Sequence, residues 1–169
     1  MAGAKFLLTI KFTTQGDGIG SSVRKEGQLD YSKGLECHGF EYAALTQIDP
    51  NSGQPIGRRK HHPVKIRREI DAASPALHQA LCTNEVFTKA TLSFNRIGAD
   101  GKPAIAHTVE LLNGTVCSYK HFHGQEEGEG TSREQYSTNE LEEFELTFQQ
   151  ITFTWVKGGK TSVDNWLAS

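Results

Sequence analysis

The sequence has neither a long apolar run nor a large excess of one charge. Its longest apolar stretch near the start, Phe6 to Ile10, is interrupted by Thr9 and is far too short for a membrane span or a signal-peptide core. Eighteen basic and twenty acidic residues leave a net charge of −2, which gives no general attraction for nucleic acid or anionic membranes. We therefore expect folding in the cytoplasm, no nucleic-acid partner and no membrane insertion.

The chain is also poor in cysteine and shows no boundary between domains. Cys37, Cys82 and Cys117 are odd in number, widely spaced and outside any paired motif, which favours reduced thiols over a disulfide framework. No internal repeat, low-complexity tract or linker interrupts the 169 residues, which suffice for one well-buried core. We expect residues 1–169 to form a single domain.

Signals for catalysis and phosphate binding are missing as well. There is no G-x-S-x-G nucleophile elbow, and the glycines from Gly16 to Gly20 lack the Gly-Lys-Ser/Thr ending of a phosphate loop. Asp71, Ser74 and His78 are the residue types of a hydrolase triad, but a helix cap explains Ser74 and a helix surface explains His78. We expect no catalytic residues and no enzyme.

One possible metal cluster also has a simpler explanation. Cys117, His121 and His123 share one face of a predicted strand, because alternate strand residues point the same way. Three such residues without a partner motif are more often ordinary surface than ligands. We expect neither a metal nor a cofactor.

Between Arg58 and Phe94 the pattern predicts a strand, a short helix and a second strand. Val64, Ile66 and Ile70 share one parity, which is typical of a strand with one buried face. Arg68 is the charged exception on that face.

A helix is predicted over about residues 75–83. Ser74 is placed to cap free backbone N–H groups, Pro75 suits the first turn, and Asn84 tolerates left-handed backbone at the end. The apolar stripe of this helix consists of Leu77, Ala80 and Leu81. So short a helix is unstable alone, so we expect it to lie against a sheet.

Strand patterns separated by turns dominate the rest of the chain. We predict a first strand ending at about Thr13 and a less regular strand over residues 35–45. We also predict turns at Asp100–Gly101 and Asn113–Gly114. The strand after the helix has one face made by Val86, Thr88, Ala90, Leu92 and Phe94.

The last long strand changes phase near Gln149–Gln150. Phe144 to Phe148 follow one parity of apolar side chains, and Ile151 to Trp155 follow the other. An inserted residue would cause this change, so we predict a β-bulge, a device that bends sheets toward closure. The fold is therefore expected to be mainly β.

Extended segments of the chain resemble the Hcp (TssD) family, the tube protein of bacterial type VI secretion systems. They are HHPVKIRREIDAASPALHQAL, the following TLSFNRIGADGK, and EEFELTFQQITFTWVKGGKTSVDNW from Glu142 to Trp166. The resemblance covers most of the chain from about Gly27 onward and is weak over residues 14–27 and 124–139. It implies a compact β-barrel of about eight or more antiparallel strands with one short helix on its flank.

The same resemblance implies a function and partners. It implies a homo-hexamer whose rings stack into the inner tube, beneath a VgrG spike and inside a sheath, carrying or accompanying effectors. It further implies assembly in the bacterial cytoplasm and secretion through the type VI system without a signal peptide. The Glu- and Gly-rich segment 124–138 departs from the family pattern, and its composition predicts a mobile loop.

Charge is arranged in two opposite blocks. Residues 58–68 hold six Lys and Arg side chains, two His and no acid, whereas residues 126–145 hold eight Glu and one Arg. These blocks either meet on neighbouring copies, giving a head-to-tail contact, or belong to solvated loops. With the resemblance, we favour contact between copies.

These observations define a candidate subunit interface. We expect the loop around Asp49 to Lys60 to reach an adjoining subunit. Trp166 either covers the end of its own barrel or helix, or contacts a subunit. The candidate contact residues are Arg58, Arg59, Lys60, His61, His62, Glu140, Glu142, Glu143 and Trp166.

An alternative function belongs to a different class. A monomeric β-barrel binding module, or a secreted effector-like protein, would share the fold without polymerising, because a fold does not fix a function.

Overall fold

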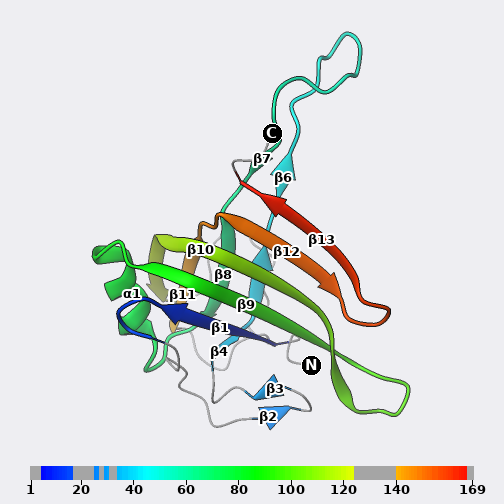
Figure 1. The fold of residues 1–169 in the computed structure, drawn as a ribbon. Helices are drawn as coiled ribbons and strands as arrows, with labels where there is room; N and C mark the ends of the chain where they lie inside the picture. Colours follow the sequence, from blue (N-terminus) through cyan, green and yellow to red (C-terminus); the bar gives the residue numbers. More distant parts are fainter. Residues whose placement is uncertain (1–4, 17–24, 27–28, 31–33, 124–139, 167–169) are drawn as a thin grey trace.

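The computed structural model describes residues 5–16, 25–26, 29–30, 34–123 and 140–166 (Figure 1). The strands of the main sheet are β1 (Phe6–Phe12), β4 (Leu35–Cys37), β5 (Gly39–Glu41), β8 (Val64–Glu69), β9 (Val86–Ile97), β10 (Pro103–His123), β11 (Glu140–Leu146), β12 (Gln150–Trp155) and β13 (Lys160–Asn165). Two small hairpins pair β2 (Lys25–Glu26) with β3 (Leu29–Asp30) and β6 (Ala44–Leu45) with β7 (Lys60–His61), and the helix is α1 (Ser74–Cys82). The segment 124–138, predicted to be a mobile loop, lies outside the described residues.

The main sheet curves so that its two end strands lie next to each other. Its order is β4-β1-β9-β10-β11-β8-β5, with β12 and β13 added beside β10, and these described strands pair antiparallel. The end strands β4 and β5 are separated only by His38, whose backbone N–H donates to the Arg67 carbonyl at 3.0 Å. Helix α1 packs beside β10 (Figure 1). The predicted mainly β, barrel-like fold with one flanking helix is confirmed.

The first strand is confirmed, and alternate apolar side chains on it lie in the core. Phe6, Leu8, Ile10 and Phe12 on β1 are all buried in the core, and Lys11 between the last two is exposed. The predicted less regular strand over residues 35–45 forms instead three short strands, β4, β5 and β6, because at His38 the chain changes from pairing with β1 to pairing with β8.

The strand-helix-strand unit is also confirmed, but its helix cap is not. Val64 and Ile66 are fully buried on β8, and α1 spans Ser74–Cys82. The N-cap is Ala73, whose side chain makes no cap, and the Ser74 hydroxyl instead accepts the Asp71 N–H at 3.0 Å. The prediction that Ser74 caps the helix is therefore wrong.

The buried face of β9 was predicted incorrectly at its start. Phe87 is fully buried, whereas Val86 and Thr88 are exposed. The register with β1 shifts at this point, since Phe12 lies opposite Phe87 but Lys11 lies opposite Lys89. The extra residue reverses which side faces inward, and single-strand alternation does not reveal it.

The predicted turn at Asn113–Gly114 is wrong, because β10 runs through both residues. Asn113 does adopt left-handed backbone, with φ of 52°. This conformation bends the strand and does not reverse it. Before the bend, residues 107–112 pair with β12. After the bend, residues 116–123 pair with β11.

Residues 147–149 separate β11 from β12 and lie beside the bend of β10. The buried side changes here as predicted, because Leu146 and Phe148 are buried on one parity and Ile151 on the other. Residues 147–149 lie outside both strands, so the predicted single strand is two strands that meet at a bend.

The predicted β-bulge lies elsewhere. Leu146 is opposite Val116 and Gln150 is opposite Leu112, so equal numbers of residues bridge the bend on both strands. The register instead shifts at Cys117 on β10. The bulge predicted at Gln149–Gln150 is therefore wrong in position, although the change of phase there is real.

Candidate subunit-contact site

A long hairpin projects from one end of the barrel, and we call residues 44–61 the arm. It starts with β6, ends with β7, and extends well beyond the sheet (Figure 1). Its limbs are joined by backbone hydrogen bonds such as Ile56 N–H to the Gln47 carbonyl at 2.8 Å. The turn at its tip is closed by Gly53, whose φ is 70° and whose N–H donates to the Asp49 carbonyl at 2.8 Å.

Apolar side chains on the arm face solvent. Leu45 is 59% exposed, Ile48 58% and Ile56 46%. A projecting hairpin with three exposed aliphatic residues gains stability when another surface covers them. The arm therefore has the properties of a contact element.

The base of the arm carries most of the predicted basic contact residues. Arg58, Lys60 and His62 are exposed. Arg59 and His61 have partners within the chain, because both contact the carboxylate of Asp164 on β13, and the His61 Nε2 atom lies 2.8 Å from it. Sequence reasoning did not single out Asp164, because only the fold brings it next to residues more than a hundred positions away.

Trp166 covers the end of its own barrel. Its ring lies 4.9 Å from that of Phe148 in an edge-on arrangement and 5.7 Å from that of His61, and the backbone N–H of Trp166 donates to the Gln149 carbonyl at 2.8 Å. A subunit contact through the rest of its surface stays a prediction.

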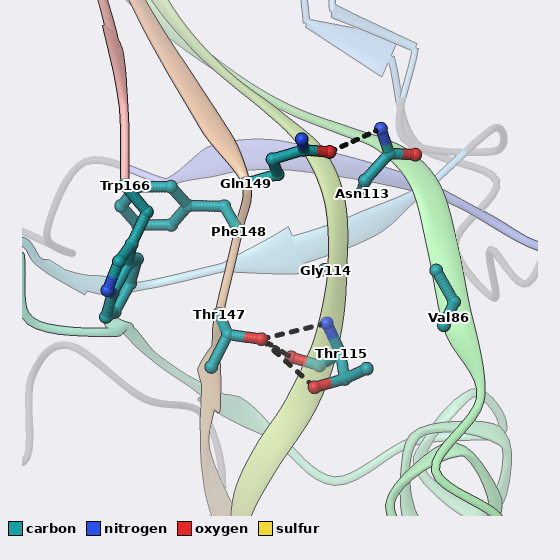
Figure 2. A pocket seen from close by; sticks show the side chains of 8 residues that line it. All are labelled: Val86, Asn113, Gly114, Thr115, Thr147, Phe148, Gln149 and Trp166. Carbon is teal, nitrogen blue, oxygen red and sulfur yellow. Dashed lines mark hydrogen bonds between the residues drawn. The ribbon is translucent and has the colours of Figure 1, made fainter. Parts of the chain in front are cut away.

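Beside Trp166 lies an open groove of about 360 Å³ at the bend between β10 and β12 (Figure 2). Val86, Phe148 and Trp166 supply its apolar walls. An amide pair crosses one side, where the Asn113 Nδ2 group donates to Gln149 Oε1 at 3.2 Å (Figure 2).

The opposite side of the groove carries hydroxyl groups. Thr115 and Thr147 face each other there, and the Thr115 N–H donates to the Thr147 hydroxyl at 3.0 Å (Figure 2). The groove is thus apolar with neutral polar edges.

Residues 140–145 of the acidic block meet the basic block within the chain. Strands β8 and β11 are neighbours, and their register places Arg68 opposite Glu142, Arg67 opposite Glu143 and Lys65 opposite Glu145. Arg67 Nη2 and Glu143 Oε2 are 2.5 Å apart. Much of the charge that was predicted to join neighbouring copies is therefore neutralised inside one copy.

Glu142 must be removed from the candidate contact residues. Its side chain is fully buried, with Oε1 2.5 Å from Arg68 Nη1 and Oε2 accepting the Tyr119 hydroxyl at 2.6 Å. A buried carboxylate offers no surface to a neighbouring copy, so this prediction is wrong. Glu140 is exposed at the start of β11, and Glu143 is partly exposed.

The rejected triad residues are engaged elsewhere. Asp71 forms an ion pair with Arg68, and the Ser74 hydroxyl accepts the Asp71 N–H. His78 is exposed on α1, with its ring 5.6 Å from that of Tyr119. The Tyr119 hydroxyl donates to the buried Glu142, so contacts run from His78 on α1 through Tyr119 on β10 to Glu142 on β11.

Within the described ranges, no group of three or more His, Cys, Asp or Glu side chains could hold a metal ion. The same part of the chain contains no helix long and apolar enough to cross a membrane.

The family model described as "Type VI secretion system effector, Hcp" matches residues 15–155, most of the chain. The chain belongs to the Hcp family. The "Major exported protein" of Pseudomonas aeruginosa is 30% identical over 150 residues, covering 89% of this chain and 83% of that protein.

Solved structures of Hcp proteins share the fold. One described as a crystal structure of Hcp protein has a TM-score of 0.82 at 18% identity, covering 99% of this chain and 100% of that one. The Hcp1 protein from E. coli EAEC 042 has a TM-score of 0.76 at 24% identity, with coverage of 98% and 99%. The secreted protein Hcp3 from Pseudomonas aeruginosa has a TM-score of 0.73 at 23% identity, with coverage of 95% and 99%.

Membership of the Hcp family establishes the class of function. The chain is a structural tube component of a type VI secretion system and belongs to no enzyme family. It works in an oligomeric assembly of that system.

Proposed function

We propose that copies of this Hcp chain form hexameric rings that stack into the inner tube of the secretion machine. The observation that carries the proposal is the arm, which projects from the barrel with its aliphatic side chains exposed. Such a hairpin buries its apolar surface when it reaches an adjoining copy. The proposal treats residues 1–169 as one ring-forming unit.

The exposed charges at the base of the arm form the polar part of this contact. Arg58, Lys60 and His62 on one copy face acidic groups such as Glu140 on another. Arg59 and Glu143 contribute through the surface that their partners within the chain leave open, and Trp166 through its exposed edge. The His61 side chain is only 3% exposed, so the prediction that it contacts a neighbouring copy is wrong. Because such pairs lie at the surface, they set the register of the contact more than its strength.

The wider assembly follows from the same proposal. Rings form in the bacterial cytoplasm, inside a contractile sheath and beneath a VgrG spike, and are expelled with effectors carried in or on the tube. No signal peptide takes part in this route.

Size-exclusion chromatography with light scattering tests the ring directly. We expect a mass six times that of the chain, and negative-stain images of annuli that stack at high concentration. A stable monomer at every concentration would overturn the proposal and favour a monomeric binding module.

A charge-reversal variant tests the role of the arm. Arg58→Glu combined with Lys60→Glu is expected to weaken the contact between copies, and raised salt is expected to act in the same direction. The control is Lys102→Glu combined with Lys157→Glu, which makes the same charge change at exposed turns away from the arm. Equal assembly of both variants would exclude the electrostatic contact.

A further inference from the structure

The arm is attached to the barrel end by a compact set of side chains. Within the arm, β6 and β7 pair with each other, and at its base the His62 N–H donates to the Ala43 carbonyl at 2.9 Å. These backbone bonds join the two limbs and do not fix the direction of the hairpin. Side chains of Arg59 and His61 make that connection by reaching the last strand, β13.

Asp164 receives both of these side chains. The guanidinium of Arg59 donates to both carboxylate oxygens of Asp164 through Nε and Nη2. His61 Nε2 lies 2.8 Å from Oδ2 of the same carboxylate. A two-pronged Arg–carboxylate contact fixes orientation as well as distance.

The remaining surroundings of His61 hold its ring in place. Its Nδ1 atom lies 2.6 Å from the hydroxyl of Tyr42, a residue two positions before the start of the arm. The centre of its ring lies 5.5 Å from that of Phe148, in an edge-on arrangement, and 5.7 Å from that of Trp166. The His61 side chain is only 3% exposed, whereas that of Asp164 is 30% exposed. Both nitrogens and the ring surface are therefore engaged.

We infer that Asp164 is a positioning residue for the arm, which it fastens to the C-terminal strand through Arg59 and His61 and so aims at the neighbouring copy. The attachment itself stands on the contacts of one chain. Its consequence for stacking rests on the proposed function. The last strand of the barrel, and not the strand pairing of the arm, sets the direction of the hairpin.

Asp164→Asn tests the attachment, because it removes the charge and leaves the shape. Hydrogen exchange of residues 44–61 and tryptic cleavage after Arg58, Arg59 and Lys60 are each expected to become about tenfold faster, as in local opening of a segment. Exchange in β1, β9 and β10 is expected to stay unchanged. Asp100→Asn, at the turn after β9, is the control and is expected to leave the arm as it is.

Two further variants separate positioning from general loss of stability. Asp164→Glu retains the carboxylate and is expected to restore most of the protection of the arm. Arg59→Gln is expected to loosen the arm, and adding it to Asp164→Asn is expected to have little further effect on exchange. Additive effects, unchanged exchange in the arm, or equal loss of protection throughout the barrel would each overturn the inference.

Electron microscopy of the same variants keeps this inference apart from the proposed function. With Asp164→Asn we expect fewer rings and shorter stacks, because a loosened arm makes a weaker contact with the adjoining copy. A loosened arm with stacks of normal length would overturn the proposed contact of the arm between copies and leave its attachment supported. A firmly held arm would overturn the attachment, whatever the stacks show.

Discussion

Arg68 on β8 and Glu142 on β11 lie opposite each other inside the barrel, with Nη1 and Oε1 2.5 Å apart. Both side chains are almost completely buried. Tyr119 donates its hydroxyl to the second oxygen of Glu142, and Asp71 pairs with the other end of the guanidinium. The barrel therefore contains a hydrogen-bonded ionic cluster on the face of β8 that the alternation of Val64 and Ile66 predicted to be apolar.

Removing one charge of this pair is expected to be costly. Glu142→Gln leaves Arg68 buried with less counter-charge, and we expect a loss of about 3 kcal/mol in the free energy of unfolding. Urea unfolding followed by circular dichroism measures it. Glu145→Gln, at a half-buried position on the same strand opposite Lys65, is the control, and we expect it to change stability by less than about 0.5 kcal/mol. Equal effects of both substitutions would contradict the importance of the buried pair.

Local patterns predicted the parts of the fold that local physics determines. The alternation of β1 and the unit of β8, α1 and β9 follow from which side chains are apolar along a short stretch. The start of β9 was missed because its inward side depends on an extra residue opposite Lys11, which is visible only in the pairing with β1. The Asn113–Gly114 pair correctly predicted a positive φ, which Asn113 adopts, but such a conformation occurs both in hairpin turns and at bends within a strand.

The candidate site was only partly predictable for a similar reason. The basic and acidic blocks are evident in the sequence, yet Arg67 and Glu143 are 76 positions apart and meet through the β8–β11 register. Likewise, the two residues at the base of the arm meet Asp164 from more than a hundred positions away. Charge patterning shows that partners exist, and only the register shows whether they are in the same copy.

The three thiols are expected to react at very different rates. Burial raises the pKa of Cys37 to about 12, so its thiol stays protonated and shielded, whereas Cys82 and Cys117 are exposed. With Ellman's reagent at pH 8, we expect two thiols to react in the folded protein and the third only after unfolding. A variant with Cys82→Ala and Cys117→Ala isolates Cys37. Rapid reaction of that variant without denaturant would show that Cys37 is accessible.

Gly114 is expected to be intolerant of any side chain. A Cβ atom there would lie 1.8 Å from the Thr147 carbonyl oxygen and 2.6 Å from the ring of Phe87. The first contact is with backbone, so the bend of β10 would have to open, and we expect Gly114→Ala to cost about 3 kcal/mol or more. Gly101→Ala is the control, since it strains an exposed turn with open space and is expected to cost about 1 kcal/mol. Thermal unfolding of the two variants should rank them in this order, and the reverse order would contradict the close packing at the bend.

The contribution of Asp164 to stability is expected to disappear in acid. Hydrogen bonds from Arg59, and then from His61, hold the pKa of Asp164 at about 2, below its ordinary value of 3.8. A carboxylate whose pKa is lower in the folded state stabilises the protein above its unfolded pKa, and this stabilisation is lost as the pH falls through the folded pKa. The difference in unfolding free energy between the unmodified chain and Asp164→Asn should therefore be constant above about pH 5, shrink between about pH 4 and pH 2, and vanish below that. Urea titrations across this range measure it, and taking the difference cancels carboxylates that titrate equally in both proteins. A difference that stays constant down to pH 2 would show that the Asp164 charge does not stabilise the fold.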